Sequence, residues 1–166
     1  EVYIFDVDHV GNIILELLAS AASRGLDVKL LIDGVGAPQW TYYSAEVWRK
    51  RGVAIKFFHA LPWQKHPYKV WQSMGLQKIV LGFFKLRHRN HRKVCIIDND
   101  IMFIGSHNIT QVHLPGTGGI VGWRDTSALL RGEEIKRYVD AFQDTWQFAQ
   151  KFYGQRWETI RRRKKE

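Results

Sequence analysis

The sequence predicts an α/β fold in which a mixed, largely parallel β-sheet carries helices on both of its faces. In the first 58 residues, short apolar runs typical of strands alternate with amphipathic runs typical of helices. Alternating strands and helices require parallel strand pairing with crossover helices. The chain of 166 residues is also 45% hydrophobic and has only 4 prolines. That composition is sufficient for one folded domain with a sizeable core.

The first half of the chain supplies the parallel part of the predicted sheet. The elements expected there are a strand at 2–5, a helix at 10–24, a strand at 28–32, a helix at 42–51 and a strand at 53–58. The first helix is indicated by Ile13, Leu17 and Ala21, which recur at helical spacing. Gly25 and Gly52 are typical helix ends. A Gly-Val-Gly sequence at 34–36 follows a strand, but it lacks the remaining glycine of a dinucleotide-binding loop.

The second half is predicted to add a hairpin, a further strand and a long helix. The expected elements are strands at 93–97, 101–104 and about 125–130, and a helix at 133–152. Asp98-Asn99-Asp100 favours a tight turn between the first two of these strands. Glu133 and Glu134 suit the positive end of the final helix. Residues 1–160 are therefore interpreted as a single domain, and 161–166 as a basic tail or the start of a linker.

Composition restricts the possible partners. The formal charge of +9 and the pI of about 9.8 favour nucleic acid, anionic lipid headgroups or phosphorylated substrates. Cys95 is the only cysteine, which excludes an internal disulfide and a cysteine-rich metal site. No apolar stretch approaches the ~20 residues that span a bilayer. Because a strand-like run is already under way at residue 1, we expect the chain to be part of a longer protein.

The residues that carry chemistry lie between 91 and 108. Side chains at positions i and i+2 of a strand share a face, so His91 and Lys93 are expected to point the same way, and Asp98 the opposite way. An imidazole beside an ammonium group suits attack on a phosphodiester, because the cation neutralises the charge that builds on the non-bridging oxygens. After the next strand, Ser106 and Asn108 add a hydroxyl and an amide that can reach the same phosphate.

The pattern His-x-Lys-x4-Asp-x6-Gly-Ser-x-Asn, filled by His91, Lys93, Asp98, Gly105, Ser106 and Asn108, resembles the signature of the phospholipase D superfamily. Segments 30–36, 51–58, 89–98 and 122–132 are similar to the N-terminal catalytic half of bacterial cardiolipin synthases and cover most of the chain in the same order. That half more often has a second glycine at the position of Ser106, and His107 is not typical of it.

The resemblance implies a two-part reaction at a site built from two such motifs. One histidine attacks phosphorus and forms a phosphohistidine, and the other protonates the leaving alcohol and then activates the acceptor. His91 is expected to attack. Lys93 and Asn108 are expected to bind phosphate oxygens with support from Ser106, and Asp98 to brace the site through hydrogen bonds.

Relatives also place a carboxylate downstream of the histidine to hold its other ring nitrogen, which fixes the tautomer. Asp125 occupies that position, so we predict an Asp125–His91 hydrogen bond. No cofactor or metal is expected, because the spacings of His88, His91, His107 and His113 fit no zinc motif.

The chain contains one such motif, so the second half of the site must come from elsewhere. It is either the C-terminal half of the same protein or a second copy of this chain. The first functional hypothesis is a phosphatidyltransferase similar to cardiolipin synthase, acting on anionic phospholipid as a peripheral protein of a bacterial cytoplasmic membrane. The alternatives are a metal-independent homodimeric endonuclease of the same superfamily, for which nucleic acid is the partner, and an inactive binding module.

Two segments leave several interpretations open. Residues 59–86 combine aromatic and basic side chains. They could cover the core, lie in a membrane interface or form a stacking surface for single-stranded nucleic acid. The glycine-rich residues 116–122 are expected to form a flexible loop near the site entrance.

Overall fold

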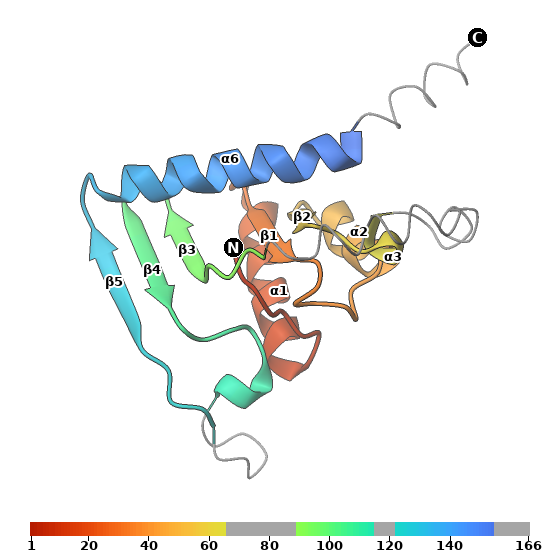
Figure 1. Cartoon of the computed structure of the whole chain (residues 1–166), viewed down its shortest axis with the longest axis horizontal. Helices are drawn as coiled ribbons and strands as arrows, with labels where there is room; N and C mark the ends of the chain where they lie inside the picture. Colours follow the sequence, from red (N-terminus) through yellow and green to blue (C-terminus); the bar gives the residue numbers. More distant parts are fainter. Residues whose placement is uncertain (66–88, 115–121, 155–166) are drawn as a thin grey trace.

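The computed structural model describes residues 1–65, 89–114 and 122–154, and Figure 1 shows how their helices and strands are arranged. The elements are, in chain order, α1 (His9–Ser23), β1 (Lys29–Asp33), α2 (Tyr42–Lys50), β2 (Ala54–Phe58), α3 (Pro62–Lys65), β3 (Val94–Ile97), β4 (Ile101–Gly105), the 3₁₀ turn η2 (Gln111–His113), β5 (Ser127–Arg131) and α6 (Ile135–Gly154). The helices and strands predicted from apolar spacing are present close to their expected bounds. The predicted tail at 161–166, the loop at 116–121 and most of the segment 59–86 lie outside the described residues.

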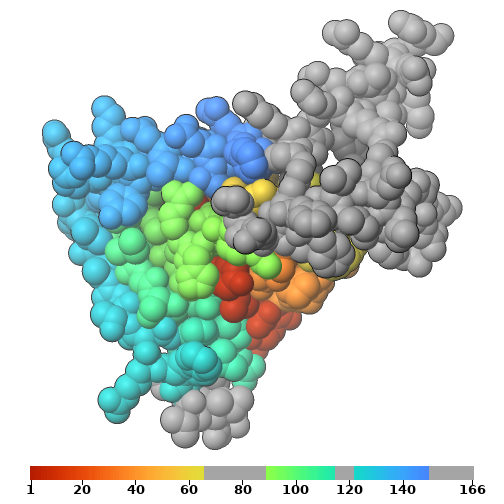
Figure 2. Space-filling model, in the orientation of Figure 1, coloured from red at the N-terminus to blue at the C-terminus, as the bar shows by residue number. Residues whose placement is uncertain are grey.

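An extended N-terminal segment joins two groups of strands into one mixed sheet. β1 and β2 are parallel, whereas β3, β4 and β5 are antiparallel in that order. Residues 1–5 lie between the two groups, because Val2 forms a parallel bridge with Ile32 and Phe5 forms another with Ile109. The first residue also hydrogen-bonds to the start of β3. Figure 2 shows this segment, in red, between the orange and green parts of the chain. The predicted mixed α/β sheet is confirmed.

Helices cover both faces of the parallel pair, as predicted. On one face, α1 and α2 bury Leu15 and Ala45 in the same cluster as Ile32 of β1. On the other face, Leu31 packs against Trp146 of α6. Neighbouring residues of β1 therefore point to opposite layers, as the pleat of a strand requires.

Helix α6 continues from the parallel pair across the antiparallel strands (Figure 1). Ile135, in its first turn, packs with Val94 of β3 and Met102 of β4. One helix thus fixes the strand that follows His91 to the rest of the sheet. Among the described residues, no helix has both the length and the apolar character needed to cross a membrane.

Local sequence sets the ends of α1 and α2. The Asp8 side chain accepts a hydrogen bond from a backbone N–H in the first turn of α1. Thr41 and Ser44 form a capping box at the start of α2, which satisfies donors that a helix start leaves unpaired. Gly25 and Gly52 follow the two helices with φ of 91°, a conformation that glycine adopts without steric cost. Both predicted helix stops are confirmed.

The buried carboxylate of Asp33 ties the end of β1 to the segment that leads into β3. Its Oδ1 accepts hydrogen bonds from the backbone N–H groups of Val35 and Gly36, both at 3.0 Å. Its Oδ2 accepts from the backbone N–H of Asn90 at 2.9 Å. Asp33 is 0% exposed, so water cannot replace these bonds. The position of the residue just before His91 therefore depends on a side chain 57 residues earlier in the chain.

We expect Asp33→Ala to lower the free energy of unfolding by about 3 kcal/mol or more, because it removes the acceptor of three backbone donors, and each unsatisfied buried donor costs about 1–3 kcal/mol. Urea denaturation followed by circular dichroism measures the change. The matched control is Asp27→Ala, whose carboxylate is 74% exposed and pairs with Lys29; it should cost less than about 1 kcal/mol. Equal losses in the two variants would contradict the anchoring role of Asp33.

Candidate active site

His91 and Lys93 lie next to each other where the chain enters β3. Nζ of Lys93 is 3.3 Å from Nδ1 of His91 and donates to the His91 carbonyl oxygen at 3.0 Å. His91 is exposed, whereas Lys93 is buried. Burial lowers the pKa of Lys93, and the negative charge of Asp125 partly opposes that shift. The expectation that the imidazole and the ammonium point the same way is confirmed.

The ring of Tyr3 contacts both groups. Its centroid lies 4.5 Å from that of the His91 ring and 5.4 Å from Nζ of Lys93, within the range of a cation–π interaction. The chain after β1 passes close by: a Cβ atom at Gly36 would lie only 2.2 Å from the Tyr3 carbonyl oxygen. Gly36 therefore permits close packing beside the site. Sequence reasoning missed Tyr3, because it is distant from the motif along the chain.

A pocket of about 380 Å³ opens beside His91. Its lining residues are Phe58, Arg89, Asn90, His91, Arg92 and Thr145. The guanidinium of Arg92 is held by Glu1 at 2.9 Å. Two arginines beside an imidazole favour binding of an anionic group, since guanidinium groups match the geometry of phosphate oxygens. Arg92 follows His91 directly and Arg89 precedes it by two residues, so both were visible beside the motif, but their shared pocket with α6 is a tertiary feature.

Ser106 and Asn108 follow β4, as predicted, and each is fixed by a hydrogen bond. Oδ1 of Asn108 accepts from the backbone N–H of Ile4 at 3.1 Å. Oγ of Ser106 donates to Oδ1 of Asp125 at 2.7 Å. Gly105, the last residue of β4, lies close to β5, since a Cβ atom there would be 2.6 Å from the hydroxyl of Ser127 and 3.0 Å from the carbonyl oxygen of Thr126. The N-terminal segment therefore touches both parts of the predicted site, with Tyr3 at His91 and Ile4 at Asn108.

The predicted hydrogen bond between Asp125 and His91 is not formed. Oδ2 of Asp125 is instead 2.5 Å from Nδ1 of His113, and its Oδ1 accepts from Ser106. The hydrogen bond with His113 and then that from Ser106 hold the pKa of Asp125 below its usual range. The physical reason is that η2 places the His113 ring against one carboxylate oxygen of Asp125, and Ser106 takes the other. Sequence reasoning considered His113 only as a possible metal ligand and missed this contact.

Asp98 does not brace the site in this structure. It occupies the turn between β3 and β4 with φ of 51° and is exposed. Within the described ranges, its carboxylate forms no hydrogen bond or ion pair. Its place at the far end of β3 from Lys93 explains this, because the turn points the side chain towards solvent. The prediction that Asp98 braces the site through hydrogen bonds is therefore wrong.

No three His, Cys, Asp or Glu side chains in residues 1–65, 89–114 and 122–154 converge as a metal site requires. His107 contacts Ser127 at 2.8 Å, and His113 contacts Asp125. The absence of a metal or cofactor from the reaction stays a prediction.

Comparison with known proteins identifies the family. Residues 1–146 match the family model described as "Cardiolipin synthase, PLD-like domain". The chain belongs to this phospholipase D-like family. It is 33% identical over 135 residues to cardiolipin synthase 1 of Staphylococcus epidermidis, a match that covers 81% of this chain and 24% of that protein. It is 29% identical over 147 residues to the cardiolipin synthase of Listeria monocytogenes, covering 89% of this chain and 27% of that protein.

The fold has a solved counterpart in Nuc of Salmonella typhimurium, described as a phospholipase D family member. The TM-score is 0.54 at 20% sequence identity, and the match covers 88% of this chain and 74% of Nuc. At that identity the likeness shows the shared fold alone. The chain spans about a quarter of the length of the cardiolipin synthases that it matches, so the activity of those whole proteins is not transferred to it directly.

We expect Asp125→Asn to remove a pH-dependent part of stability. A carboxyl whose pKa is depressed in the fold stabilises it above its unfolded pKa, and this contribution is lost as the pH falls through the folded pKa. The stability difference between wild type and Asp125→Asn should therefore be constant well above the ordinary pKa of an aspartate carboxyl and shrink as the pH falls below it. Urea denaturation between about pH 3 and about pH 7 measures the difference. A difference that grows on acidification would contradict the assignment.

Proposed function

We propose that this chain supplies one half of a metal-independent phosphodiester-transfer site, and that the site moves a phosphatidyl group from one anionic phospholipid to a hydroxyl of another. The observation that carries the proposal is the contact of 3.3 Å between the His91 ring and the Lys93 ammonium beside a pocket with two arginines. Membership of the cardiolipin synthase family supports the choice of substrate.

The proposed reaction has two displacements at phosphorus. The His91 imidazole attacks, a P–N bond forms and the P–O bond to the leaving glycerol breaks while a second histidine donates the proton that the alkoxide needs. That second histidine then takes the proton of the acceptor hydroxyl, whose oxygen attacks phosphorus and breaks the P–N bond. Lys93 and Asn108 bind the non-bridging oxygens, where negative charge grows in each transition state.

The contacts of His91 support the need for a second half. A lysine ammonium only donates hydrogen bonds, so a neutral His91 accepts at Nδ1 and carries its proton on Nε2. Attack through Nε2 requires the other tautomer. The described partners of the ring are Lys93 and Tyr3, and neither places an acceptor at Nδ1. We propose that pairing with the second half, either a C-terminal half or another copy of this chain, brings the ring into the reactive state.

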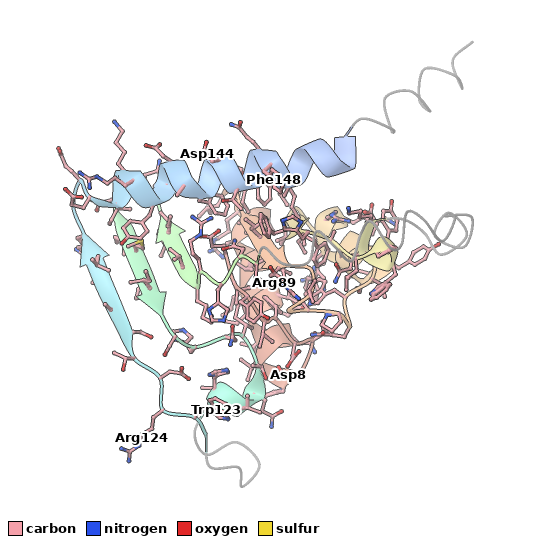
Figure 3. All side chains as sticks on the ribbon, in the orientation of Figure 1. Asp8, Arg89, Trp123, Arg124, Asp144 and Phe148 are labelled. Atoms are coloured by element: carbon pink, nitrogen blue, oxygen red, sulfur yellow. The ribbon has the colours of Figure 1, made fainter. Side chains whose placement is uncertain are left out.

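We further propose that the chain works at an anionic membrane surface, as a peripheral part of a bacterial cytoplasmic membrane enzyme. Trp123 is 71% exposed and precedes the exposed Arg124, at the end of the molecule remote from α6 (Figure 3). Tryptophan favours the headgroup region of a bilayer, and a basic side chain near an anionic surface contributes about 1 kcal/mol. Trp123 also lies 6.1 Å from the His113 ring, so this surface adjoins the phosphate-binding side chains.

The test is mass spectrometry of lipids after incubation with phosphatidylglycerol vesicles in EDTA. We expect cardiolipin from the wild type and at least about a thousandfold less from His91→Ala, because loss of a nucleophile removes the covalent route. The matched control is His9→Ala, which changes an exposed histidine at the start of α1 and should leave the yield unchanged. If the chain alone gives no product, the same variants are compared with the C-terminal half of the Staphylococcus epidermidis relative supplied in trans.

Two outcomes would overturn this proposal. Equal cardiolipin from His91→Ala and wild type would exclude His91 as the reacting group. Cleavage of single-stranded DNA that depends on His91, with no lipid product in either arm, would support the endonuclease alternative instead.

A further inference from the structure

We infer that His113 is a positioning residue of the phosphate site, which ties Asp125 to Asn108 through its two ring nitrogens. Nδ1 lies 2.5 Å from Oδ2 of Asp125, and Nε2 lies 3.4 Å from Nδ2 of Asn108. The motif that predicts the site does not include this residue. That the site binds phosphate rests on the proposed function, but the two contacts of His113 can be tested without measuring turnover.

The His113 ring is held in place independently of these two contacts. It ends η2, where its backbone N–H donates to the carbonyl oxygen of Thr110 at 3.2 Å. Its side chain is 11% exposed, and the ring of Trp123 packs 6.1 Å away. A short turn therefore fixes the ring between the segment after β4 and the segment before β5, which are also joined here by a backbone hydrogen bond from the Trp123 N–H to the Val112 carbonyl oxygen at 3.2 Å.

The hydrogen-bond partners determine which ring nitrogen carries the proton. The Asp125 carboxylate can only accept, so Nδ1 of His113 donates to it. Oδ1 of Asn108 is already occupied by the backbone N–H of Ile4, so Asn108 turns its NH₂ group towards His113. Nε2 must then accept. A neutral His113 with its proton on Nδ1 satisfies all of these groups, whereas a proton on Nε2 would set two donors against each other.

The contact with His113 orients the group of Asn108 that would bind phosphate. The Asn108 amide nitrogen has two N–H donors; one points to Nε2 of His113, and this fixes the direction of the other, which is free to bind a phosphate oxygen. Ser106 is oriented in the same way, because its hydroxyl donates to the carboxylate that His113 holds. Without His113, Asn108 would keep only its bond from the Ile4 N–H, and Asp125 only its bond from Ser106. Both phosphate-binding side chains would then be held by one contact fewer, while the contacts of His91 and Lys93 would be unchanged.

The first test is nuclear magnetic resonance of the imidazole ¹⁵N nuclei in the full chain at neutral pH, with the His113 signals assigned by their loss in His113→Ala. We expect a neutral ring protonated on Nδ1, with an Nδ1–H proton that exchanges slowly because Asp125 holds it. A ring protonated on Nε2, or one whose Nδ1–H exchanges as fast as that of the exposed His9, would overturn the inference. This result does not depend on whether the protein transfers lipid.

The second test measures binding of diethyl phosphate through the side-chain amide signals of Asn108. We expect His113→Ala to weaken binding about tenfold, which corresponds to the loss of one oriented hydrogen bond. His113→Asn should recover part of this loss, because its amide can still donate to Asp125 from about the position of Nδ1. His9→Ala is the control and should bind as the wild type does.

The two proposals fail in different ways. Wild-type affinity in His113→Ala would show that His113 is only a buried structural side chain. If the wild type binds no diethyl phosphate, the proposed function is contradicted. The tautomer of His113 then still decides whether His113 ties Asp125 to Asn108. Circular dichroism of each variant separates a local change from loss of the fold.

Discussion

The whole arrangement depends on the extended N-terminal segment, residues 1–5, which bridges the parallel pair of strands and the segment after β4. Its backbone bonds to β1 on one side, through Val2, and to the segment after β4 on the other, through Phe5. The same short stretch supplies Tyr3, whose ring contacts His91, and Ile4, whose N–H orients Asn108. Because a strand alternates its side chains and backbone groups at fixed intervals, the register of this segment sets the positions of both parts of the site together.

Burial of charge is the second constraint. The carboxylate of Asp33 is fully buried and is stabilised by backbone N–H groups, one of which belongs to Asn90. The ammonium of Lys93 is also buried and has a lowered pKa. A buried charge is costly unless hydrogen bonds or opposite charges compensate it. The backbone donors compensate the buried charge of Asp33. Asp125 compensates the charge of Lys93 only in part, so the Lys93 ammonium is suited to bind an anion.

The site is divided into a reactive pair and a set of orienting groups. His91 and Lys93 form the pair beside the arginine-lined pocket. Ser106, Asp125 and Asn108 form a chain of hydrogen bonds that passes through His113. The division fits the proposed reaction: this chain itself holds the side chains proposed to bind phosphate, and the proposal takes the second imidazole from another half.

The sequence by itself determined the helices, the strands and the reactive pair. Apolar spacing repeats every two or every 3.6 residues, so it identifies local elements. The two-residue separation predicted that His91 and Lys93 lie together, and they do so in the segment just before β3. Only the tertiary structure decided which side chains surround them. Ile4 and Asn108 are 104 residues apart, and His113 displaced His91 as the partner of Asp125. Such contacts depend on how distant segments pack into one sheet, and local periodicity carries no information about that packing.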